Sequence, residues 1–267
     1  MKFHGLILCG ALAAMLASAP AAAVTREEAA IQNAMLVLRE MQSMPDLQIP
    51  DQLLARAEGI IVLPANVKAA FGLGGRGGSG VMLVRNADRS WSHPAFVSTG
   101  AISFGFQAGA QVADIVLVLT TRRSIEGITD GKLTLGADAS AAAGPVGRTA
   151  MASTSLTFDS EVYAYSRTQG LFAGVSLEGT GIFINRKANR RFYDGESSAT
   201  QILTATGTPP SPADELVNEV TRLTSGTAQS AQSVASEAAE QRPPAAERPI
   251  EPRTYPMPDA QPGAEPR

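Results

Sequence analysis

The chain has 267 residues, of which 44% are hydrophobic and 18% charged, and its formal net charge at pH 7 is −3. This near-neutral balance argues against a general nucleic-acid-binding protein, although it permits a local basic patch. With 17 prolines and 25 glycines, the chain is expected to contain segments that do not join a packed core.

Residues 1–23 have the features of a cleavable secretory signal: Lys2, an apolar run over 5–16, and then the small residues ASAPAAA. We predict cleavage after Ala23 and export to the periplasm or cell envelope. The apolar run is shorter than the roughly 20 residues that span a bilayer. Cys9 lies inside that run, so a lipoprotein is the less favoured alternative. Cleavage removes this only cysteine, which excludes thiol chemistry, and it leaves 21 basic and 25 acidic residues, a net charge of −4.

A helix is predicted at the start of the mature chain. Thr25 and Glu28 have the spacing of a capping box, and apolar residues recur at helical spacing as far as Pro45. A second helix over 51–58 ends at Gly59, which suits the left-handed position after a helix. The apolar stripe of the first helix consists of Ile31, Ala34, Met35, Leu38 and Met41.

The middle of the chain, 59–195, is predicted to form strands that follow one another directly. In one of them, Ile102, Phe104 and Phe106 alternate with small or polar residues, which is the period of a half-buried strand. Asp130 and Gly131 suit a hairpin turn. The predicted strands are GIIVLP, GVMLVR, AFVSTGAISFGFQAG, DIVLVLTT, KLTLGADAS, SLTFDSEVYAYSR and LFAGVSLEGTGIFINR.

A third helix opens at Ser211 and Pro212, with Leu216, Val220 and Leu223 as its stripe. We therefore predict an α+β fold: an antiparallel β-sheet or partial barrel flanked by an N-terminal helix pair and a C-terminal helix. The last segment is rich in Pro, Ala and charge and has too little apolar surface to fold. The expected organisation is a secretory signal at 1–23, one domain at 24–223 and a disordered Ala/Pro-rich tail at 224–267.

The segment FGLGGRGGSG at 71–80 contains G-x-G-x-x-G from Gly72 to Gly77. A dinucleotide site needs a helix next, whose N-terminus holds the pyrophosphate, but the next predicted element is a strand. No Lys-Ser or Lys-Thr follows, so the segment is not a P-loop. We interpret the glycines as positions where backbones approach closely or a strand bulges, with a ligand-facing backbone as the alternative.

His93 is the only histidine after cleavage, which argues against a histidine metal site and against two-histidine mechanisms. It stands in WSHPA, where Pro94 fixes a turn and Trp91 is expected to pack, so a structural role is favoured over pairing with a nucleophilic Ser or Thr. The carboxylates show no readable pair. We predict no catalytic site, no metal and no cofactor, and we keep a hidden lipid or cell-wall enzyme as the least favoured hypothesis.

Basic residues cluster at three places. Arg186, Lys187, Arg190 and Arg191 lie in NRKANRR, a predicted turn between two strands. Arg122 and Arg123 follow the strand DIVLVLTT, and Lys68 and Arg76 flank the apolar stretch AAFGLGG. Such residues can meet an anionic surface, each contributing about 1 kcal/mol near anionic lipid. A solvated surface kept soluble by charge is the alternative.

Several blocks of the chain together resemble the SYLF family of lipid-binding domains, over roughly residues 30–223. They are GIIVLP with the glycine run, WSHPAFVSTG, SFGFQAGAQVADIVLVL, AAAGPVGR, YAYSRTQGLFAGVSLEG and NRRFYDGESSATQIL. The resemblance implies a non-catalytic module. Eukaryotic members bind phosphoinositide membranes, and some bind actin beside a Src-homology-3 or FYVE domain, whereas exported bacterial members usually have a single domain.

The resemblance also implies that the membrane-binding element of eukaryotic members is a lysine-bearing amphipathic helix at the start of the domain. The matching helix here offers Arg26 and Arg39 against Glu27, Glu28 and Glu40. We therefore do not carry over phosphoinositide specificity. We expect the apolar stripe of this helix to pack on the sheet, with a position in a membrane interface as the alternative.

We predict a non-enzymatic envelope domain that binds anionic phospholipid or another amphiphile, with apolar surface supplying affinity and basic residues binding the headgroup. Arg186, Lys187, Arg190 and Arg191 rank first for this role, and Lys68, Arg76, Arg122 and Arg123 rank second. The alternative is an envelope scaffold whose Pro-rich tail reaches a protein partner. Neither nucleic acid nor actin is expected as a partner, the latter because an exported protein does not meet the cytoskeleton.

Overall fold

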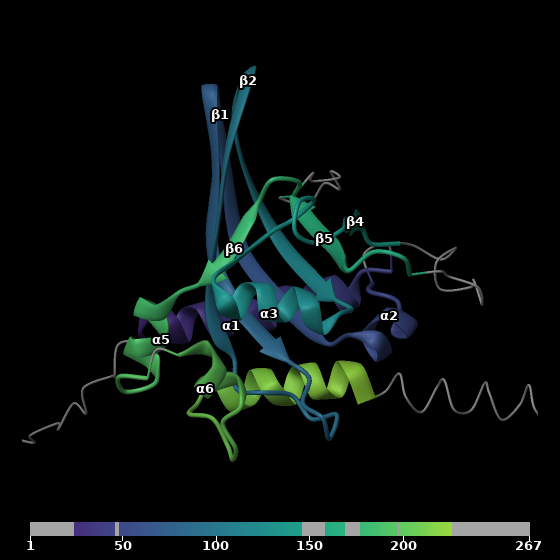
Figure 1. Cartoon of the computed structure of the whole chain (residues 1–267), viewed down its shortest axis with the longest axis vertical. Helices are drawn as coiled ribbons and strands as arrows, with labels where there is room; N and C mark the ends of the chain where they lie inside the picture. The colour runs from purple at the N-terminus through teal and green to yellow at the C-terminus, as the bar shows by residue number, and fades with distance from the viewer. Residues whose placement is uncertain (1–23, 46–47, 146–157, 169–176, 197, 226–267) are drawn as a thin grey trace, which may run out of the picture. The chain divides into compact units, whose positions relative to one another are not determined.

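The computed structural model describes residues 24–45, 48–145, 158–168, 177–196 and 198–225, and for 70–73 and 103–109 it describes the backbone alone. Helices cover both faces of one open sheet (Figure 1). The predicted α+β fold, with a helix pair at the start and a helix at the end, is confirmed. The predicted signal at 1–23 and almost all of the predicted tail lie outside the described residues.

The described helices and strands follow one another in a fixed order. They are α1 (Arg26–Ser43), α2 (Asp51–Arg56), β1 (Gly59–Val84), β2 (Ala95–Leu119), α3 (Arg122–Asp130), β3 (Lys132–Thr134), β4 (Ala141–Ala143), β5 (Val162–Thr168), β6 (Gly181–Ile184), α5 (Arg186–Phe192) and α6 (Ala199–Leu203). Residues 213–225 form a further helix, where the sequence predicts one.

Strand β2 is the centre of the six-stranded sheet, whose order is β3-β6-β2-β5-β4, with β1 paired to β2 as well. The pairings of β2 with β1, β5 and β6, and of β3 with β6, are antiparallel. The pairing of β4 with β5 is parallel. The predicted antiparallel sheet is therefore correct except at this short edge.

Strands β1 and β2 each join segments that the sequence predicts as separate strands. β1 runs from GIIVLP through the glycine run to VMLV, and β2 runs from AFVSTG to DIVLVL. The two pair from Gly59–Leu119 to Met82–Ala95. Glycine is unfavourable in strands, so the sequence predicts a break at the run. A long partner strand supplies backbone hydrogen bonds regardless of side chain, and the strand continues.

The parts of β1 and β2 nearest the helices are buried on both faces. One face of β1 contacts α1, α2 and the helix 213–225, and the other face contacts α3 and α6. Such burial explains why GIIVL and VMLV are continuous apolar runs without the alternation of a half-exposed strand. The first face carries Ile60, Val62, Val81 and Leu83, and the second carries Ile61, Leu63, Met82 and Val84.

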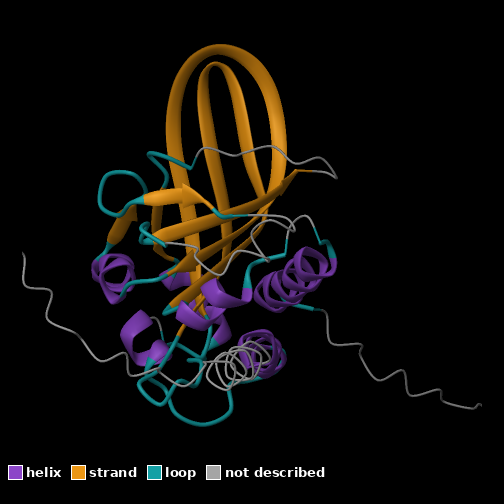
Figure 2. Ribbon diagram, turned by 90° about the vertical axis from the view of Figure 1, so that its right-hand side faces the viewer, coloured by secondary structure: helices purple, strands orange, loops and turns teal. Residues whose placement is uncertain are grey.

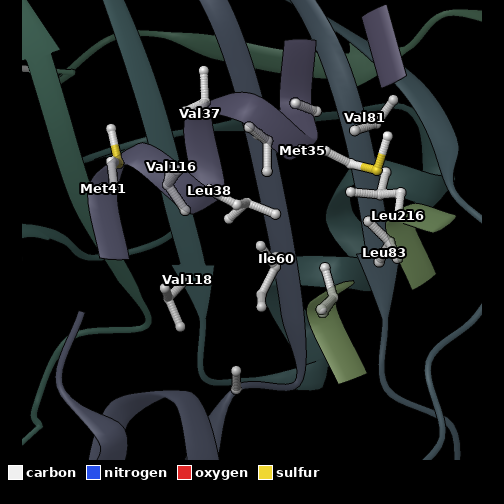
Figure 3. Packing of buried hydrophobic residues seen from close by; sticks show 14 of the residues in the cluster. Met35, Val37, Leu38, Met41, Ile60, Val81, Leu83, Val116, Val118 and Leu216 are labelled. Carbon is white, nitrogen blue, oxygen red and sulfur yellow. The ribbon is translucent and has the colours of Figure 1, made fainter. Parts of the chain in front are cut away.

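Helix α1 packs on the sheet, as predicted. Its capping box is present: Glu28 N donates to Thr25 Oγ1 at 3.1 Å, and Thr25 N donates to Glu28 Oε2 at 2.7 Å. Its whole predicted stripe is buried, and Figure 3 shows Met35 and Leu38 among side chains of the sheet and Leu216. The alternative, in which the stripe lies in a membrane interface, is wrong for this conformation.

The predicted hairpin turn at Asp130 and Gly131 is wrong. Asp130 is the last residue of α3, a helix that begins after Thr121, whose hydroxyl accepts a hydrogen bond from Ser124 N. Only Ile125 and Ile128 form its apolar side, which is too short a stripe for the sequence to signal a helix.

The predicted end of the second helix is also displaced. Helix α2 ends at Arg56, and Gly59 is the first residue of β1 instead of the cap of the helix. Near the other end of the chain, Leu216 and Val220 are fully buried in the helix 213–225, which confirms the predicted apolar stripe.

Candidate functional site

Strands β1 and β2 continue beyond the helices as a projecting two-stranded arch (Figure 1). We define the arch as residues 67–77 of β1 paired with residues 100–112 of β2. At its apex the pairing shifts from Phe71–Ala108 to Gly72–Gly105, so that β2 has extra residues there without a partner on β1. An excess of this kind bends a strand pair, and Figure 2 shows the two strands as nested loops.

Glycines let the two legs of β1 approach each other at the base of the arch. A Cβ on Gly80 would lie 1.9 Å from the carbonyl oxygen of Val62, and one on Gly78 would lie 2.3 Å from Nδ2 of Asn66. Only glycine fits at such distances. Asn66 Nδ2 also donates to Thr99 Oγ1 at 2.8 Å, which ties one leg to the other. The predicted role of the glycine run in close backbone approach is confirmed.

A charged network joins the base of the arch to the helices. Ala65, at a bulge with φ of 48°, donates its N–H to Asp114 Oδ1 at 3.0 Å. Arg167 of β5 lies 2.8 Å from Asp114 Oδ2 and also pairs with Glu40 of α1. The hydrogen bond with Asp114, assisted by Glu40, raises the pKa of Arg167. These contacts fix the direction in which the arch leaves the sheet.

The arch has an apolar surface with one cation on each leg. Val67 is 44% exposed and Ile102 is 77% exposed. Lys68 and Arg76 are the only charged residues of the arch. Lys68 is exposed, whereas Arg76 is partly buried and desolvation lowers its pKa. The prediction that Ile102 lies on the buried side of its strand is wrong, because the helices that form the core pack against other parts of β2.

The first-ranked basic residues lie on a helix, and the predicted turn is wrong. Helix α5 begins after Asn185, whose Oδ1 accepts from Ala188 N at 3.0 Å. Asn189 is fully buried, and its Oδ1 accepts from Phe96 N at 2.7 Å, which attaches the helix to β2. The sequence does not signal this helix because it is short and is stabilised by asparagine contacts more than by an apolar stripe.

The cations of α5 differ in their contacts. Arg186, Lys187 and Arg190 are exposed and form no ion pair within the part of the chain that the structure describes. Arg191 Nε donates to Glu27 Oε1 of α1 at 2.8 Å, and this hydrogen bond raises the pKa of Arg191. Arg191 therefore joins α5 to α1, while the other three cations face solvent.

The remaining predicted cations lie on α3. Arg122 Nε lies 2.7 Å from Glu58 Oε2, and its Nη2 donates to the carbonyl oxygen of Arg85, so its side chain holds α3 against the ends of β1. Arg123 is exposed on the same helix. The eight predicted headgroup residues thus lie on three separate elements, and the structure does not bring them together at one site.

The sequence reasoning missed Val67 and Ile102 as surface residues. A signal was available, because β2 has no charged residue from Ala95 to Ala113 although burial by helices accounts for only part of that length. An uncharged stretch too long for the core indicates apolar surface outside it.

His93 has the contacts of a structural residue, as predicted. Its Nε2 lies 2.9 Å from the carbonyl oxygen of Gly207, and its ring stacks on Tyr193 with centroids 6.5 Å apart. Trp91 packs under the guanidinium of Arg85 at 4.4 Å. Among the described residues, no three His, Cys, Asp or Glu side chains are grouped to hold a metal ion. No described helix combines the length and apolarity needed to cross a bilayer.

Comparison with known proteins gives this architecture a family. Residues 100–223 match the Ysc84 family, described as "Las17-binding protein actin regulator". The SH3 domain-containing YSC84-like protein 1 of Bos taurus is 36% identical over 191 residues, which cover 69% of this chain and 56% of that protein. The LAS seventeen-binding protein 3 of Saccharomyces cerevisiae is 38% identical over 174 residues, which cover 64% of this chain and 38% of that protein.

The chain thus spans little more than half the length of the bovine relative and less of the yeast one. The matched residues include most of β2, and with it the outer strand of the arch, as well as the whole of α5. The chain contains a domain of the Ysc84 family, the SYLF family to which its sequence blocks pointed, and this is a family of non-catalytic binding domains.

Proposed function

We propose that this chain is a non-enzymatic module that binds phospholipid surfaces and that the arch is the part that contacts lipid. The observation that carries the proposal is the arch itself. It projects from the core, exposes Val67 and Ile102, and carries charge only at Lys68 and Arg76 (Figure 1). A projecting apolar element with cations at its flanks is suited to a bilayer interface.

Apolar transfer supplies most of the affinity in this proposal. Moving an exposed Val or Ile side chain out of water is worth about 1.5–3 kcal/mol when burial is complete. The tip segments AAFGLGG and ISFGFQAGA contain aromatic and aliphatic residues and no ionisable side chain. Entry of the tip into the interface therefore requires no charge to be desolvated.

The flanking cations set the preferred lipid and the depth. Lys68 and Arg76 can keep their charged ends among headgroups while the tip enters, and each contributes about 1 kcal/mol near anionic lipid. Backbone groups at a strand edge are costly in hydrocarbon, so a two-stranded element is expected to insert only to the depth of the headgroups and upper acyl chains. Anionic vesicles should bind better than neutral ones, with a residual affinity that survives high salt.

Vesicle flotation of residues 24–267 tests the proposal. The variant Ile102→Asp places a charge on the arch, and Leu36→Asp is its matched control, because Leu36 is 53% exposed on α1. We expect Ile102→Asp to lose most binding to vesicles of phosphatidylcholine with phosphatidylglycerol, while Leu36→Asp binds as the parent does. Equal binding by the parent and both variants would contradict the role of the arch.

We further propose that the chain is an exported, bacterial-type member of its family that acts in the periplasm or cell envelope. The signal-like order of charge, apolar run and small residues in 1–23 supports this. Expression of the full chain in a Gram-negative bacterium followed by fractionation and N-terminal sequencing is the test. The expected product starts at Val24 in the periplasm. An uncleaved cytosolic protein would overturn the export proposal and leave the lipid proposal standing.

A second candidate function is the binding of a protein partner. It is favoured by the description of the matched family, which names Las17 and actin. For an exported chain the partner would be an envelope protein, reached by the Pro-rich tail. Pull-downs with and without residues 226–267, alongside actin co-sedimentation, separate the possibilities. Co-sedimentation with actin would contradict our expectation that actin is no partner, and recovery of no partner by either form would count against the scaffold.

A further inference from the structure

We infer that α5 provides a second, separate contact for anionic lipid, so that one molecule can join two bilayers. The inference rests on the proposed function of the arch and goes beyond it. It assigns to Arg186, Lys187 and Arg190 a bilayer other than the one that the arch contacts.

The three cations of α5 stand out from the other exposed arginines of the described core. Arg39 and Arg222 pair with Glu219, and Arg89 and Arg122 pair with Glu58. Arg186, Lys187 and Arg190 have no such carboxylate among the described residues. Arg186 and Arg190 are also four residues apart on the helix, where like charges repel. An external anion would relieve this repulsion.

The basic face is held in place before any ligand arrives. Asn185 N donates to the carbonyl oxygen of Phe96 at 2.8 Å, and Asn185 Nδ2 donates to Ser98 Oγ at 3.0 Å. The buried Asn189 adds its contact with Phe96 N. Helix α5 is thereby fixed to the sheet at both its start and its middle, so its cations need no ordering of the backbone to meet a surface.

The separation between α5 and the arch means that they cannot share one bilayer contact. Helix α5 is attached at Phe96, and Ile102 lies six residues further along β2. At about 3.3 Å per residue, this is about 20 Å along the strand. The screening length at physiological salt is about 8 Å. Figure 1 shows the arch rising from the sheet while α5 lies beside α1.

The form of the basic face favours a bilayer as its partner. Arg186, Lys187 and Arg190 are three long side chains on the exposed side of a helix whose Ala188 and Asn189 are buried beneath. Positions 186 and 190 share one side, and 187 is turned by about 100° from 186. Flexible cations spread over a convex surface suit an extended layer of headgroups more than a single enclosed ligand.

Vesicle clustering tests the inference. Residues 24–267 are mixed with vesicles of phosphatidylcholine and phosphatidylglycerol, and particle size is followed by dynamic light scattering while flotation reports binding. The variant Arg186→Gln/Arg190→Gln is compared with Arg123→Gln/Lys132→Gln, which removes the same charge from exposed positions on α3 and β3. Light scattering of the lipid-free proteins shows whether each stays monomeric.

We expect the parent and the α3–β3 control to raise particle size severalfold at low salt. The α5 variant should float with vesicles yet leave them dispersed, and high salt should disperse clusters of the parent without releasing all of the bound protein. The inference is overturned if the α5 variant clusters vesicles as the parent does. Binding by the parent without clustering also overturns it, points to an acidic protein partner at α5 and leaves the arch proposal intact. Absence of binding by the parent overturns both.

Discussion

The same two strands form the most buried and the most exposed parts of this domain. Near the helices, Ile61 of β1 and Ile115 of β2 are at most 1% exposed, whereas Ile102 in the arch is 77% exposed. The pairing of β1 with β2 continues through both regions. Strand pairing is thus a property of the backbone, while burial depends on which helices cover the strand. Residues of the core should govern stability, and residues of the arch should govern binding.

The arch is held at its base by close backbone contact and by polar groups. Gly80 against Val62, Asn66 with Thr99, and the network of Asp114 fix the legs, and no helix needs to cover the tip. This arrangement leaves apolar side chains free for a partner. It also makes the comparison between the core and the arch open to direct tests.

The largest effect is expected from Gly80→Ala. Its Cβ would lie 1.9 Å from the carbonyl oxygen of Val62, so the two legs of β1 must separate, and the loss of unfolding free energy should exceed about 4 kcal/mol. Gly77→Ala is the control, because its Cβ would lie 3.7 Å from the nearest atom and should change stability by less than about 1 kcal/mol. Urea unfolding measures both, and equal midpoints would refute the close approach.

A second test compares two isoleucines on the same strand. Ile115→Ala should cost about 2–5 kcal/mol, because it opens a cavity in the core. Ile102→Ala should change the unfolding free energy by less than about 0.5 kcal/mol, because the side chain is exposed. Vesicle binding should show the reverse order. A large loss of stability in Ile102→Ala would mean that the arch is packed, and would count against its role as a free surface.

A smaller effect is expected at the base of the arch. Asp114→Ala removes the acceptor of Ala65 N and one partner of Arg167, which should cost about 1–3 kcal/mol. Asp130→Ala, at an exposed position at the end of α3, is the matched control and should have little effect. Equal denaturation midpoints for the two variants would show that the network does not hold the arch.

The smallest effect tests charge within the core. Burial raises the pKa of Glu219, but hydrogen bonds and the charges of Arg222 and Arg39 outweigh it, and the net pKa lies below the ordinary value of 4.5. A lowered folded-state pKa stabilises the protein above pH 4.5, and this contribution fades as pH falls through the folded-state value. Glu219→Gln should cost about 1 kcal/mol at pH 7.

The matching measurement is denaturation of the parent and Glu219→Gln at pH 7 and in acid. The gap between them should close in acid. The gap between the parent and Ile115→Ala should not, because apolar packing does not titrate. A gap for Glu219→Gln that is the same at both pH values would exclude the ion pairs as its source.

Local patterns in the sequence were sufficient for the class of fold and for helix α1. The capping box at Thr25 and the stripe from Ile31 to Met41 depend on neighbouring residues alone, and both are present. The close approach at Gly80 was also predictable in kind, since only glycine permits it.

The arch and the short helices depend on contacts between distant residues. β1 crosses the glycine run because β2 pairs with it, and α5 forms where Asn189 meets Phe96, a residue 93 positions away along the chain. Neither partner is visible in a local window of sequence. The basic residues were therefore identified as candidates, while their distribution over three elements required the structure.

The most direct test of the account is a fluorescent probe on the tip of the arch. Residues 24–267 contain no cysteine, so Ile102→Cys can carry a single environment-sensitive dye, and Leu36→Cys on α1 carries the same dye as control. On addition of anionic vesicles, the account predicts a blue shift and stronger emission at position 102 and no change at position 36. Binding of the vesicles with no change at position 102 would contradict it.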